Sequence, residues 1–435
     1  MLSSSHILAI AAAATGEWTV IPLTRRQVEW APGGLRRLEQ VAAMTGAPLV
    51  YCDWLDGTVP HPLTDCLEGS VRDDFDFGHL VVVPTPLLKE VAAEMTGDYK
   101  AAGWYDLRLR LMRRGRPFHL AETLYSAGPE NKSEDSEAQF SYVDPRNRAS
   151  QIEMEQVFTE HLKAIRAYLA PSQCRKTDVS RGEFPVEASV IIPVRNRCRT
   201  IRDAVRSALS QVTDFPFNVI VVDNRSDDGT AEILAEIAAE DPRLVVKSTA
   251  SIPYPAIGIG GCWNIAICSE ECGRFAIQLD SDDLYSSESV LTRIVGKFRE
   301  EQCAMVVGSY TLTDFDGNTI PPGLIDHAEW TDGNGRNNAL RINGLGAPRA
   351  FYTPVAREIR FPDTCYGEDY AMGLAISRSY RIGRIYESLY LCRRWEDNTD
   401  HALPLERINR NNLYKDSLRT AEILKRQQIN EHITK

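Results

Sequence analysis

The 435-residue sequence predicts an α/β protein whose larger part is a mostly parallel sheet flanked by helices. Two observations support this fold class. From residue 188 onward, short apolar runs of strand length alternate with segments whose apolar residues recur at helical spacing. Polar residues directly follow several of these runs, as they do where parallel strands end at a ligand-binding edge. The alternation implies right-handed crossovers that leave helices on both faces of the sheet.

The elements of this larger part follow from composition and periodicity. Each expected strand is a short run rich in Val, Ile or Phe, and each expected helix shows an amphipathic stripe. The expected strands cover residues 189–193, 217–222, 243–247, 275–279, 305–308 and 388–391. The expected helices cover residues 199–211, 230–240 and 369–379.

Polar stretches divide the chain and predict its domains. We expect a smaller α/β half domain at residues 1–126 and a linker at 127–186 that contains a helix at about 151–169. A main domain is expected at 187–400 and a helical tail at 401–435. Acidic residues interrupt the basic face of this tail, so we expect the tail to dock on the main domain rather than on a membrane surface.

Composition narrows the class of protein. The formal net charge of −11 argues against nucleic acid as the main partner. The ten cysteines include no CxxC pair, and no run approaches the roughly 20 apolar residues of a membrane span. The apolar run at residues 7–14 is short and has no basic region before it. We therefore expect a cytoplasmic protein with reduced thiols. Peripheral contact with the inner face of the membrane and homo-oligomerisation stay open.

Three carboxylates are crowded into Asp280-Ser281-Asp282-Asp283, directly after the apolar run 275–279. Like charges so close repel, and a cation usually offsets them. Oxygen ligands at a strand end suit Mg²⁺ or Mn²⁺, and such an ion commonly accompanies a diphosphate. The alternative is a solvated helix cap, because Asp is also a common N-cap residue. By itself the motif does not decide between these two interpretations.

The ordered motifs resemble those of the family-2 glycosyltransferases, which have the GT-A fold. The resemblance covers about residues 187–395, roughly half the chain. Each motif is weak alone, but the set keeps the family's order. The motifs are VIIPVRN (190–196), VVDNRSDDGT (221–230), GIGGCWN (258–264), LDSDD (279–283) and GEDY (367–370).

The resemblance implies a divalent cation, Mn²⁺ or Mg²⁺, and a nucleotide-sugar donor. Asp282 matches the family's metal-binding Asp, and Asp280 matches a position that contacts the donor ribose or the metal shell. Asp223 matches the Asp that bonds the nucleobase. The family commonly has Arg before Asn264, where this chain has Trp263, so one contact is in doubt. The positions implied to bind the donor nucleotide are Pro193, Arg195, Asn196, Asp223, Asn264, Asp280 and Ser281.

An inverting transfer needs a base that removes the proton of the acceptor hydroxyl. By resemblance this base is Asp369, and its position at the start of an expected helix would favour its ionised form. Glu368 beside it either orients the acceptor or pairs with an Arg. Capping of the helix is the alternative role for Asp369. Asp283 is either a supporting group or a helix cap.

The polar loop after residues 388–391 resembles the loop with which family members close over the diphosphate. It implies His401 as a third metal ligand, against the alternative of an exposed loop histidine, and implies that Arg394 and Trp395 belong to the site. The segment 309–349 should determine acceptor specificity. There, Arg349 and Trp330 are candidates, and Trp330 either stacks on a sugar or packs in the core. The implied acceptor is a glycan or a glycolipid.

The N-terminal part resembles a partial, degenerate second copy of the same fold, because residues 18–125 track residues 275–390. In this alignment Thr24-Arg25-Arg26-Gln27 stands opposite the acidic motif, and Asp106 stands opposite Asp369. Arginines in place of carboxylates cannot hold a divalent cation, so we expect this copy to be non-catalytic.

The sequence thus favours a metal-dependent, inverting glycosyltransferase that serves polysaccharide or glycoconjugate synthesis. Two alternatives remain. A nucleotidyltransferase on a related fold would use the carboxylates for metals and would need no base at Asp369. A nucleotide- or glycan-binding pseudoenzyme is favoured by Trp263, but the retained carboxylates weigh against it.

Overall fold

The computed structural model describes residues 2–128, 147–253, 257–328, 330–395, 398 and 403–433. The chain folds into two compact units, which we call the N-terminal unit and the main unit. The N-terminal unit comprises Met1–Leu169, Leu340–Ile342 and Ala402–Lys435. The main unit comprises Ala170–Ala339 and Asn343–His401.

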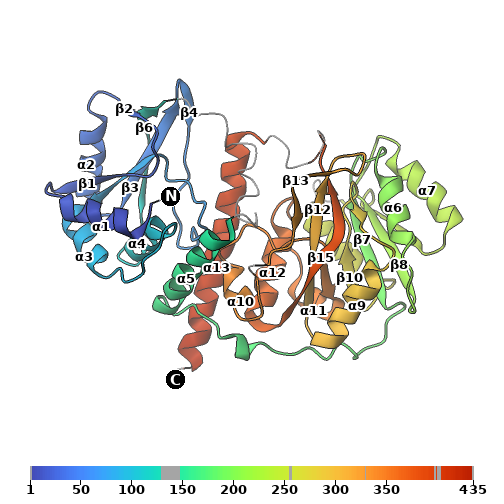
Figure 1. Cartoon of the computed structure of the whole chain (residues 1–435). Coiled ribbons are helices and arrows are strands. Elements are labelled where there is room, and N and C mark those ends of the chain that lie inside the picture. The colour runs from blue at the N-terminus through green and yellow to red at the C-terminus, as the bar shows by residue number, and fades with distance from the viewer. Residues whose placement is uncertain are drawn as a thin grey trace. The chain divides into compact units, whose positions relative to one another are not determined.

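The main unit is built on one mixed sheet with the order β11-β15-β12-β14-β10-β7-β8-β9, and β13 pairs with β12. Strands β7 to β10 run parallel where they pair, as do β12 and β15, whereas β14 is antiparallel to both of its neighbours. The expected mostly parallel α/β sheet is therefore confirmed (Figure 1). Its strands are β7 (Ala188–Val194), β8 (Phe217–Asp223), β9 (Leu244–Ser248), β10 (Phe275–Gln278), β11 (Leu284–Tyr285), β12 (Met305–Thr313), β13 (Thr319–Ile325), β14 (Arg349–Tyr352) and β15 (Ile382–Arg393).

Helices cover this sheet with buried apolar residues, as α6 shows. In α6 the buried residues Ile201, Ala204, Val205 and Ala208 recur at spacings of three and four. The central strand β7 needs cover on both faces, since Val190, Ile191 and Ile192 are all fully buried. The helices of the main unit are α6 (Ile201–Leu209), α7 (Thr230–Glu240), α8 (Ile259–Cys268), α9 (Val290–Glu301), α10 (Gly335–Asn338), α11 (Thr353–Ile359) and α12 (Glu368–Ser379).

The N-terminal unit is a smaller α/β structure whose sheet has the order β1-β5-β3-β6-β2, with β4 paired to β3. Strand β1 lies at one end of this order and pairs with β5. The strands are β1 (Trp18–Pro22), β2 (Val28–Trp30), β3 (Val50–Asp56), β4 (Val59–His61), β5 (Leu80–Pro84) and β6 (Phe118–Ala127). The helices are α1 (Ser4–Ala13), α2 (Gly34–Thr45), α3 (Thr85–Ala93), α4 (Gly103–Met112), α5 (Arg148–Ala164) and α13 (Leu405–Ile433).

The sheet of the N-terminal unit has the same topology as one half of the main sheet. The order β1-β5-β3-β6-β2 corresponds to β10-β14-β12-β15-β11, and β4 pairs with β3 as β13 pairs with β12. Each pair of neighbours also keeps its direction, including the parallel pair β3–β6 and its counterpart β12–β15. Helices α2, α3 and α4 occupy the same places in the chain order as α9, α11 and α12. The N-terminal unit has no described counterpart of β7, β8 and β9.

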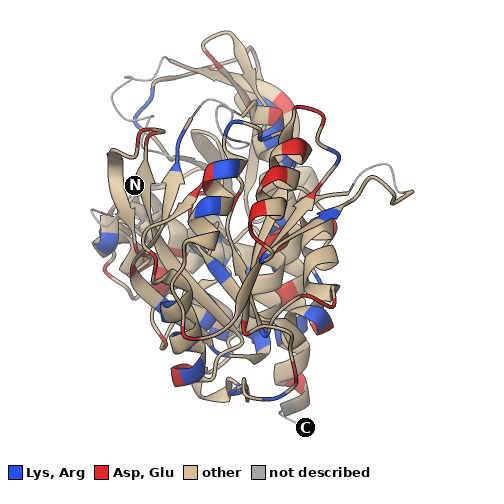
Figure 2. Ribbon diagram, turned by 90° about the vertical axis from the view of Figure 1, so that its right-hand side faces the viewer, with Lys and Arg blue, Asp and Glu red and all other residues tan. Residues whose placement is uncertain are grey.

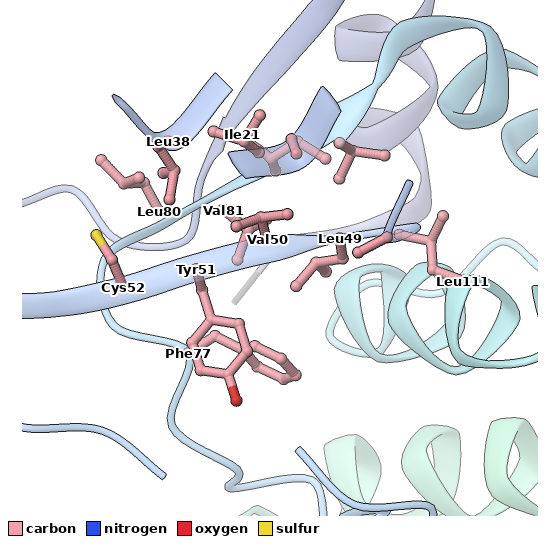
Figure 3. Close-up of a cluster of buried hydrophobic side chains, with 14 of the residues drawn as sticks. Ile21, Leu38, Leu49, Val50, Tyr51, Cys52, Phe77, Leu80, Val81 and Leu111 are labelled. Carbon is pink, nitrogen blue, oxygen red and sulfur yellow. The ribbon is translucent and has the colours of Figure 1, made fainter. Parts of the chain in front are cut away.

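The core of the N-terminal unit lies on both faces of β3 (Figure 3). Tyr51 and Phe77 lie on one face, with their rings edge to face and their centroids 4.9 Å apart. Ile21, Leu38 and Val50 pack on the other face and are fully buried. The unit therefore has a hydrophobic core of its own.

The C-terminal helix α13 packs within the N-terminal unit, and its contacts include Leu340–Ile342, a segment of the expected main domain (187–400) that also groups with this unit. Its buried face is polar rather than apolar. Asp416 accepts a hydrogen bond from Ser70 at 2.9 Å, and Arg419 donates to the carbonyl oxygens of Leu340 and Ile342, each at 2.9 Å. Buried charges persist where they are paired in this way. Sequence periodicity missed the contact because it scores apolar residues.

Lys and Arg are interspersed with Asp and Glu along the chain (Figure 2). Within the part of the chain that the structure describes, no helix combines the length and the apolar character needed to cross a bilayer.

Candidate active site

The acidic motif lies directly after β10, at the edge of the main sheet. Asp280 accepts a hydrogen bond from the Gln278 side chain, with 2.9 Å between Nε2 and Oδ1. Its backbone amide donates to the hydroxyl oxygen of Tyr390 at 3.0 Å. Burial raises the pKa of Asp280, and the positive charge of Arg349 partly offsets this. Ser281 beside it is 8% exposed.

Asp282 is held by two side-chain donors from the segment that follows β15. Its Oδ2 accepts hydrogen bonds from Trp395 Nε1 at 3.3 Å and from Asn398 Nδ2 at 3.2 Å. Arg197 Nε lies 3.8 Å from the same oxygen. A cation that binds this oxygen must displace the indole and amide donors, because their hydrogens point at the same lone pairs.

Asp283 does not cap a helix, because α9 begins only at Val290. Its Oδ1 accepts a hydrogen bond from the backbone amide of Arg393 at 2.8 Å, which anchors the end of β15. Burial raises the pKa of Asp283 well above its ordinary value, and the charges of Asp282 and Asp280 add to the shift. Because its Oδ1 is engaged by the backbone of β15, Asp283 is suited to a supporting role.

The donor set fits a cation that is shared with a substrate. Among the described residues, no three His, Cys, Asp or Glu side chains come together as a metal cage. Mg²⁺ and similar ions are commonly held by one or two carboxylates together with substrate phosphates and water. Asp282, with Asp280 beside it, is suited to this second arrangement. His401, the expected third ligand, lies outside the described residues.

The candidate base Asp369 lies in the first turn of α12, which begins after Gly367 in a left-handed conformation (φ 76°). Its Oδ2 is 3.0 Å from Nη1 of Arg349. Burial raises the pKa of the neighbouring Glu368 to about 8, and the charge of Asp369 adds to this shift. Glu368 is therefore protonated at neutral pH, and Asp369 is the carboxylate suited to accept a proton.

The nucleotide-side candidates lie at the ends of β7 and β8. Asp223 is 5% exposed and accepts a hydrogen bond from the Ser226 amide at 3.2 Å. Asn196 joins the two loops, because its backbone amide donates to Ser226 Oγ and its side chain accepts from the Asp227 amide. Pro193 is half-buried within β7, and Arg195 after it is exposed. The two strand ends therefore form one edge, as their sequence positions predict.

In the free protein the side chain of Asn264 bonds the protein backbone and is not available to bind the donor nucleotide. Its Nδ2 donates to the carbonyl oxygen of Phe361 at 2.8 Å, and its Oδ1 accepts from the Phe361 amide at 3.0 Å. Both ends of the amide are therefore engaged. Trp263 is a core residue that is 4% exposed and stacks on the Phe361 ring.

The residues expected on the acceptor side lie in different parts of the main unit. Trp330 is only 2% exposed and the Arg384 guanidinium lies over its ring, so its proposed role as a sugar platform is dropped. The backbone amide of Arg394 donates a hydrogen bond to the carbonyl oxygen of Thr313 at 2.8 Å. Arg394 directly precedes Trp395 in the sequence. Arg349 lies within the carboxylate cluster.

Gln278 and Tyr390 contact this cluster and were not predicted. The signal for Gln278 was available, because it is a polar residue in the otherwise apolar run FAIQL just before the acidic motif. Tyr390 had no comparable signal. Its approach to Asp280 depends on the parallel pairing of β15 with β12, which links segments distant in the sequence.

The strand register corrects the internal alignment by one residue. Trp18 pairs with Pro84 and Phe275 pairs with Tyr352, and both partners are the N-cap residues of helices. Trp18 therefore corresponds to Phe275. It follows that Arg25 and Arg26 correspond to Asp282 and Asp283. Arg26 forms an ion pair with Asp56 at 2.7 Å, so this corner carries its own cation.

Asp106 does not occupy the position of the candidate base. Tyr105 and Tyr370 are both the third residue of their helices and both donate to a loop carbonyl oxygen. This places Trp104 at the position of Asp369. Asp106 instead pairs with Arg110, with 2.6 Å between Oδ1 and Nε.

Comparison with known proteins identifies a domain that lies almost entirely within the main unit. Residues 189–357 match the model of glycosyl transferase family 2. An uncharacterized glycosyltransferase of Rickettsia felis is 27% identical over 207 residues, which are 47% of this chain and 32% of that protein. Chondroitin synthase of Escherichia coli is 35% identical over 138 residues, which are 31% of this chain and 19% of that protein.

The chain spans only 20–32% of the length of the first curated relatives that it matches. Among solved structures, residues 1–349 of S. aureus TarS in complex with UDP-GlcNAc are similar, with 22% identity and a TM-score of 0.42. This similarity covers 55% of this chain and 72% of that one.

Proposed function

Because residues 189–357 match the model of glycosyl transferase family 2, we propose that this protein transfers a sugar from a nucleotide diphosphate donor to a hydroxyl group of a glycan or glycolipid. The observation that carries the proposal is the joint placement of donor-side and acceptor-side carboxylates. Asp280 follows β10, Asp369 opens α12, and both face the same arginine, Arg349.

In the proposed reaction Asp369 accepts the proton of the acceptor hydroxyl as that oxygen attacks the anomeric carbon. Attack on the face opposite the leaving diphosphate inverts the anomeric configuration. Glu368 is unsuited to the role of base at neutral pH, because burial raises its pKa to about 8. The protonated Glu368 can instead donate a hydrogen bond within the site.

A divalent cation, Mn²⁺ or Mg²⁺, would neutralise charge on the leaving diphosphate. Asp282 would hold it, with Asp280 in support. The donor nucleotide would lie along the edge formed by Asp223, Asn196 and Arg195. The similarity to a chondroitin synthase favours a polysaccharide or glycoconjugate as the product.

A donor panel tests this proposal. The full chain is incubated with Mn²⁺ and UDP-, GDP- or dTDP-sugars, and release of nucleoside diphosphate is measured with and without glycan acceptors. We expect diphosphate release from one donor class. Pyrophosphate release from a nucleoside triphosphate would favour a nucleotidyltransferase instead, and the absence of both turnover and donor binding would refute the proposal.

Two position-specific variants test the base. Asp369→Asn is expected to lower the transfer rate by at least about 10²-fold, because the amide cannot accept the proton, while nucleotide binding is retained. Asp106→Asn in the N-terminal unit is the matched control and should leave the transfer rate unchanged. Transfer that survives in Asp369→Asn would show that the base is another group.

A further inference from the structure

We infer that Arg349 is a positioning residue that orients the candidate base Asp369 and couples it to the donor-side carboxylate Asp280. This inference rests on the proposed function, because it assigns a role within the same site. It differs from the sequence-based expectation, which gave Arg349 to acceptor binding.

A chain of four residues, linked through three side chains and both the side chain and the backbone amide of Arg349, crosses the site from acceptor side to donor side. Nη1 of Arg349 lies 3.0 Å from Oδ2 of Asp369. The backbone amide of Arg349 donates to Oε1 of Gln278 at 3.1 Å, and Nε2 of Gln278 donates to Oδ1 of Asp280 at 2.9 Å. The relay Asp369–Arg349–Gln278–Asp280 therefore runs between the paired strands β14 and β10.

The Arg349 guanidinium is fixed where the relay needs it. Its Nη1 also donates to the carbonyl oxygen of Gly346 at 2.7 Å, and the side chain is only 17% exposed. Two directed contacts on a planar group leave it little rotational freedom. A guanidinium held in this way can hold the Asp369 carboxylate in one orientation.

The charges around Arg349 explain why a cation is required. Asp280 faces it from the end of β10, Glu368 and Asp369 face it from α12, and Tyr390 faces it from β15. Burial lowers the pKa of Arg349, but these neighbours raise it above its ordinary value overall. Without the guanidinium, the carboxylates of Asp280 and Asp369 would repel each other in a partly buried site.

The N-terminal unit provides an internal comparison. The strand register and the helix starts place Ile21 at the position of Gln278, Leu23 at that of Asp280, Val81 at that of Arg349 and Trp104 at that of Asp369. All four counterparts are apolar. Since the shared topology is kept without the relay, the relay is not needed to form the fold. Its presence in the unit with the acidic motif points to a role in the reaction.

The alternative role for Arg349 is to bind a phosphate of the donor, and this role predicts different effects of substitution. A guanidinium that turns to a diphosphate must release Asp369, so donor binding would depend on it. A positioning role instead leaves donor binding intact and alters the rate and its dependence on pH. Measurements of kcat, nucleotide affinity and pH profile therefore separate the two roles.

The test compares Arg349→Gln and Arg349→Lys in the full chain, with Arg293→Gln as control. Arg293 pairs with Glu387 on α9 and β15, and takes no part in the relay. We expect Arg349→Gln to lower kcat by about 10²-fold. The acid limb of the kcat/KM profile should also move to higher pH, because a neutral side chain at position 349 no longer stabilises the ionised form of Asp369. Arg349→Lys should restore part of both effects, and the Kd for UDP with Mn²⁺ should change less than about threefold.

A tenfold or greater loss of UDP affinity with an unchanged kcat at saturating donor would assign Arg349 to the diphosphate. An unmoved acid limb with a normal kcat would leave Arg349 no role in the reaction. Either result overturns the inference.

A second measurement does not depend on turnover. The titration of Asp369 is followed by NMR of protein labelled with ¹³C at the Asp side chains, with the signal assigned by its loss in Asp369→Asn. The inference requires a higher titration midpoint in Arg349→Gln than in the wild type, and an unchanged midpoint refutes it. If no donor turns over, the proposed function fails while this result still decides the charge coupling.

Discussion

At the scale of single residues, the site contains more carboxylates than can be ionised together. Burial raises the pKa of Asp280, Asp283 and Glu368, and Glu368 reaches about 8. Arg349 offsets the charge on the acceptor side, while Arg197 and Arg393 contact the acidic motif. The raised pKa of Glu368 separates its role from that of Asp369, whose carboxylate contacts Arg349.

The raised pKa of Glu368 predicts a stability that depends on pH. A carboxyl group whose pKa rises from 4.5 to about 8 on folding holds its proton more tightly in the folded state. Its contribution to stability is therefore complete below about pH 4.5 and is lost as the pH rises toward 8. We expect Glu368→Gln to increase the free energy of unfolding by about 1–3 kcal/mol at pH 8, and by much less at pH 5.

Urea unfolding of Glu368→Gln at the two pH values measures this difference. Glu387→Gln is the control, because the Glu387 side chain is 72% exposed. A gain of equal size at pH 5 and pH 8 would contradict the assigned protonation of Glu368.

At the scale of elements, regular patterns identified the main strands and helices. The apolar runs that became β7, β8 and β10 are buried, and the helical stripe that became α6 faces the sheet. Patterns could not supply side-chain partners. The amide of Asn264 fits the donor motif, yet it bonds the Phe361 backbone nearly a hundred residues away.

The sequence alignment of the N-terminal unit with the main unit failed for a related reason. Residue identity favoured placing Asp106 opposite Asp369, but hydrogen-bond register and the buried tyrosines place Trp104 there. The helix alignment was off by two residues, and the strand alignment was off by one. A shift of one residue is invisible to composition, although it moves every side chain of a strand to the opposite face. His401 stays a prediction, since it lies outside the described residues.

Asn264 provides a prediction for the joint between α8 and the segment after α11. Asn264→Ala leaves the Phe361 amide and carbonyl without these partners, and Phe361 is 4% exposed. We expect a loss of about 1–3 kcal/mol in the free energy of unfolding with little change in nucleotide affinity. Thermal unfolding and UDP titration measure the two effects. Weaker UDP binding without a loss of stability would return Asn264 to the nucleotide site.

At the scale of the whole molecule, one chain contains the same half-sheet twice with opposite charges at one corner. Asp282 and Asp283 follow β10, whereas Arg25 and Arg26 follow β1. Strands β7, β8 and β9 occur in the main sheet and have no counterpart among the described strands of the N-terminal unit. The nucleotide-side residues lie at the ends of β7 and β8. The N-terminal unit therefore retains the topology of the acceptor side without a described donor side.

This asymmetry predicts where nucleotide and cation act. With UDP and Mn²⁺, amide hydrogen exchange should slow around residues 193–197, 223–226 and 280–283. Residues 23–27 of the N-terminal unit should exchange as in the free protein, because Arg25 and Arg26 repel a divalent cation. Mass spectrometry of peptic fragments measures both regions. Protection confined to residues 23–27 would place the ligand in the wrong unit.

The end strand β1 affects how the N-terminal unit would behave if it were produced without the main unit. Its counterpart β10 is paired on both sides, by β14 and β7, whereas β1 is paired with β5. No described strand pairs with the other side of β1, where the backbone N–H and C=O groups are of the kind that recruit a further strand. The strand is short and ends in Pro22, which lacks an N–H group, and both features weaken such recruitment. If this unit were produced alone, the segment from Trp18 to Pro22 would be one of its two end strands, and a charged residue at Thr19 is the change to make against self-association there.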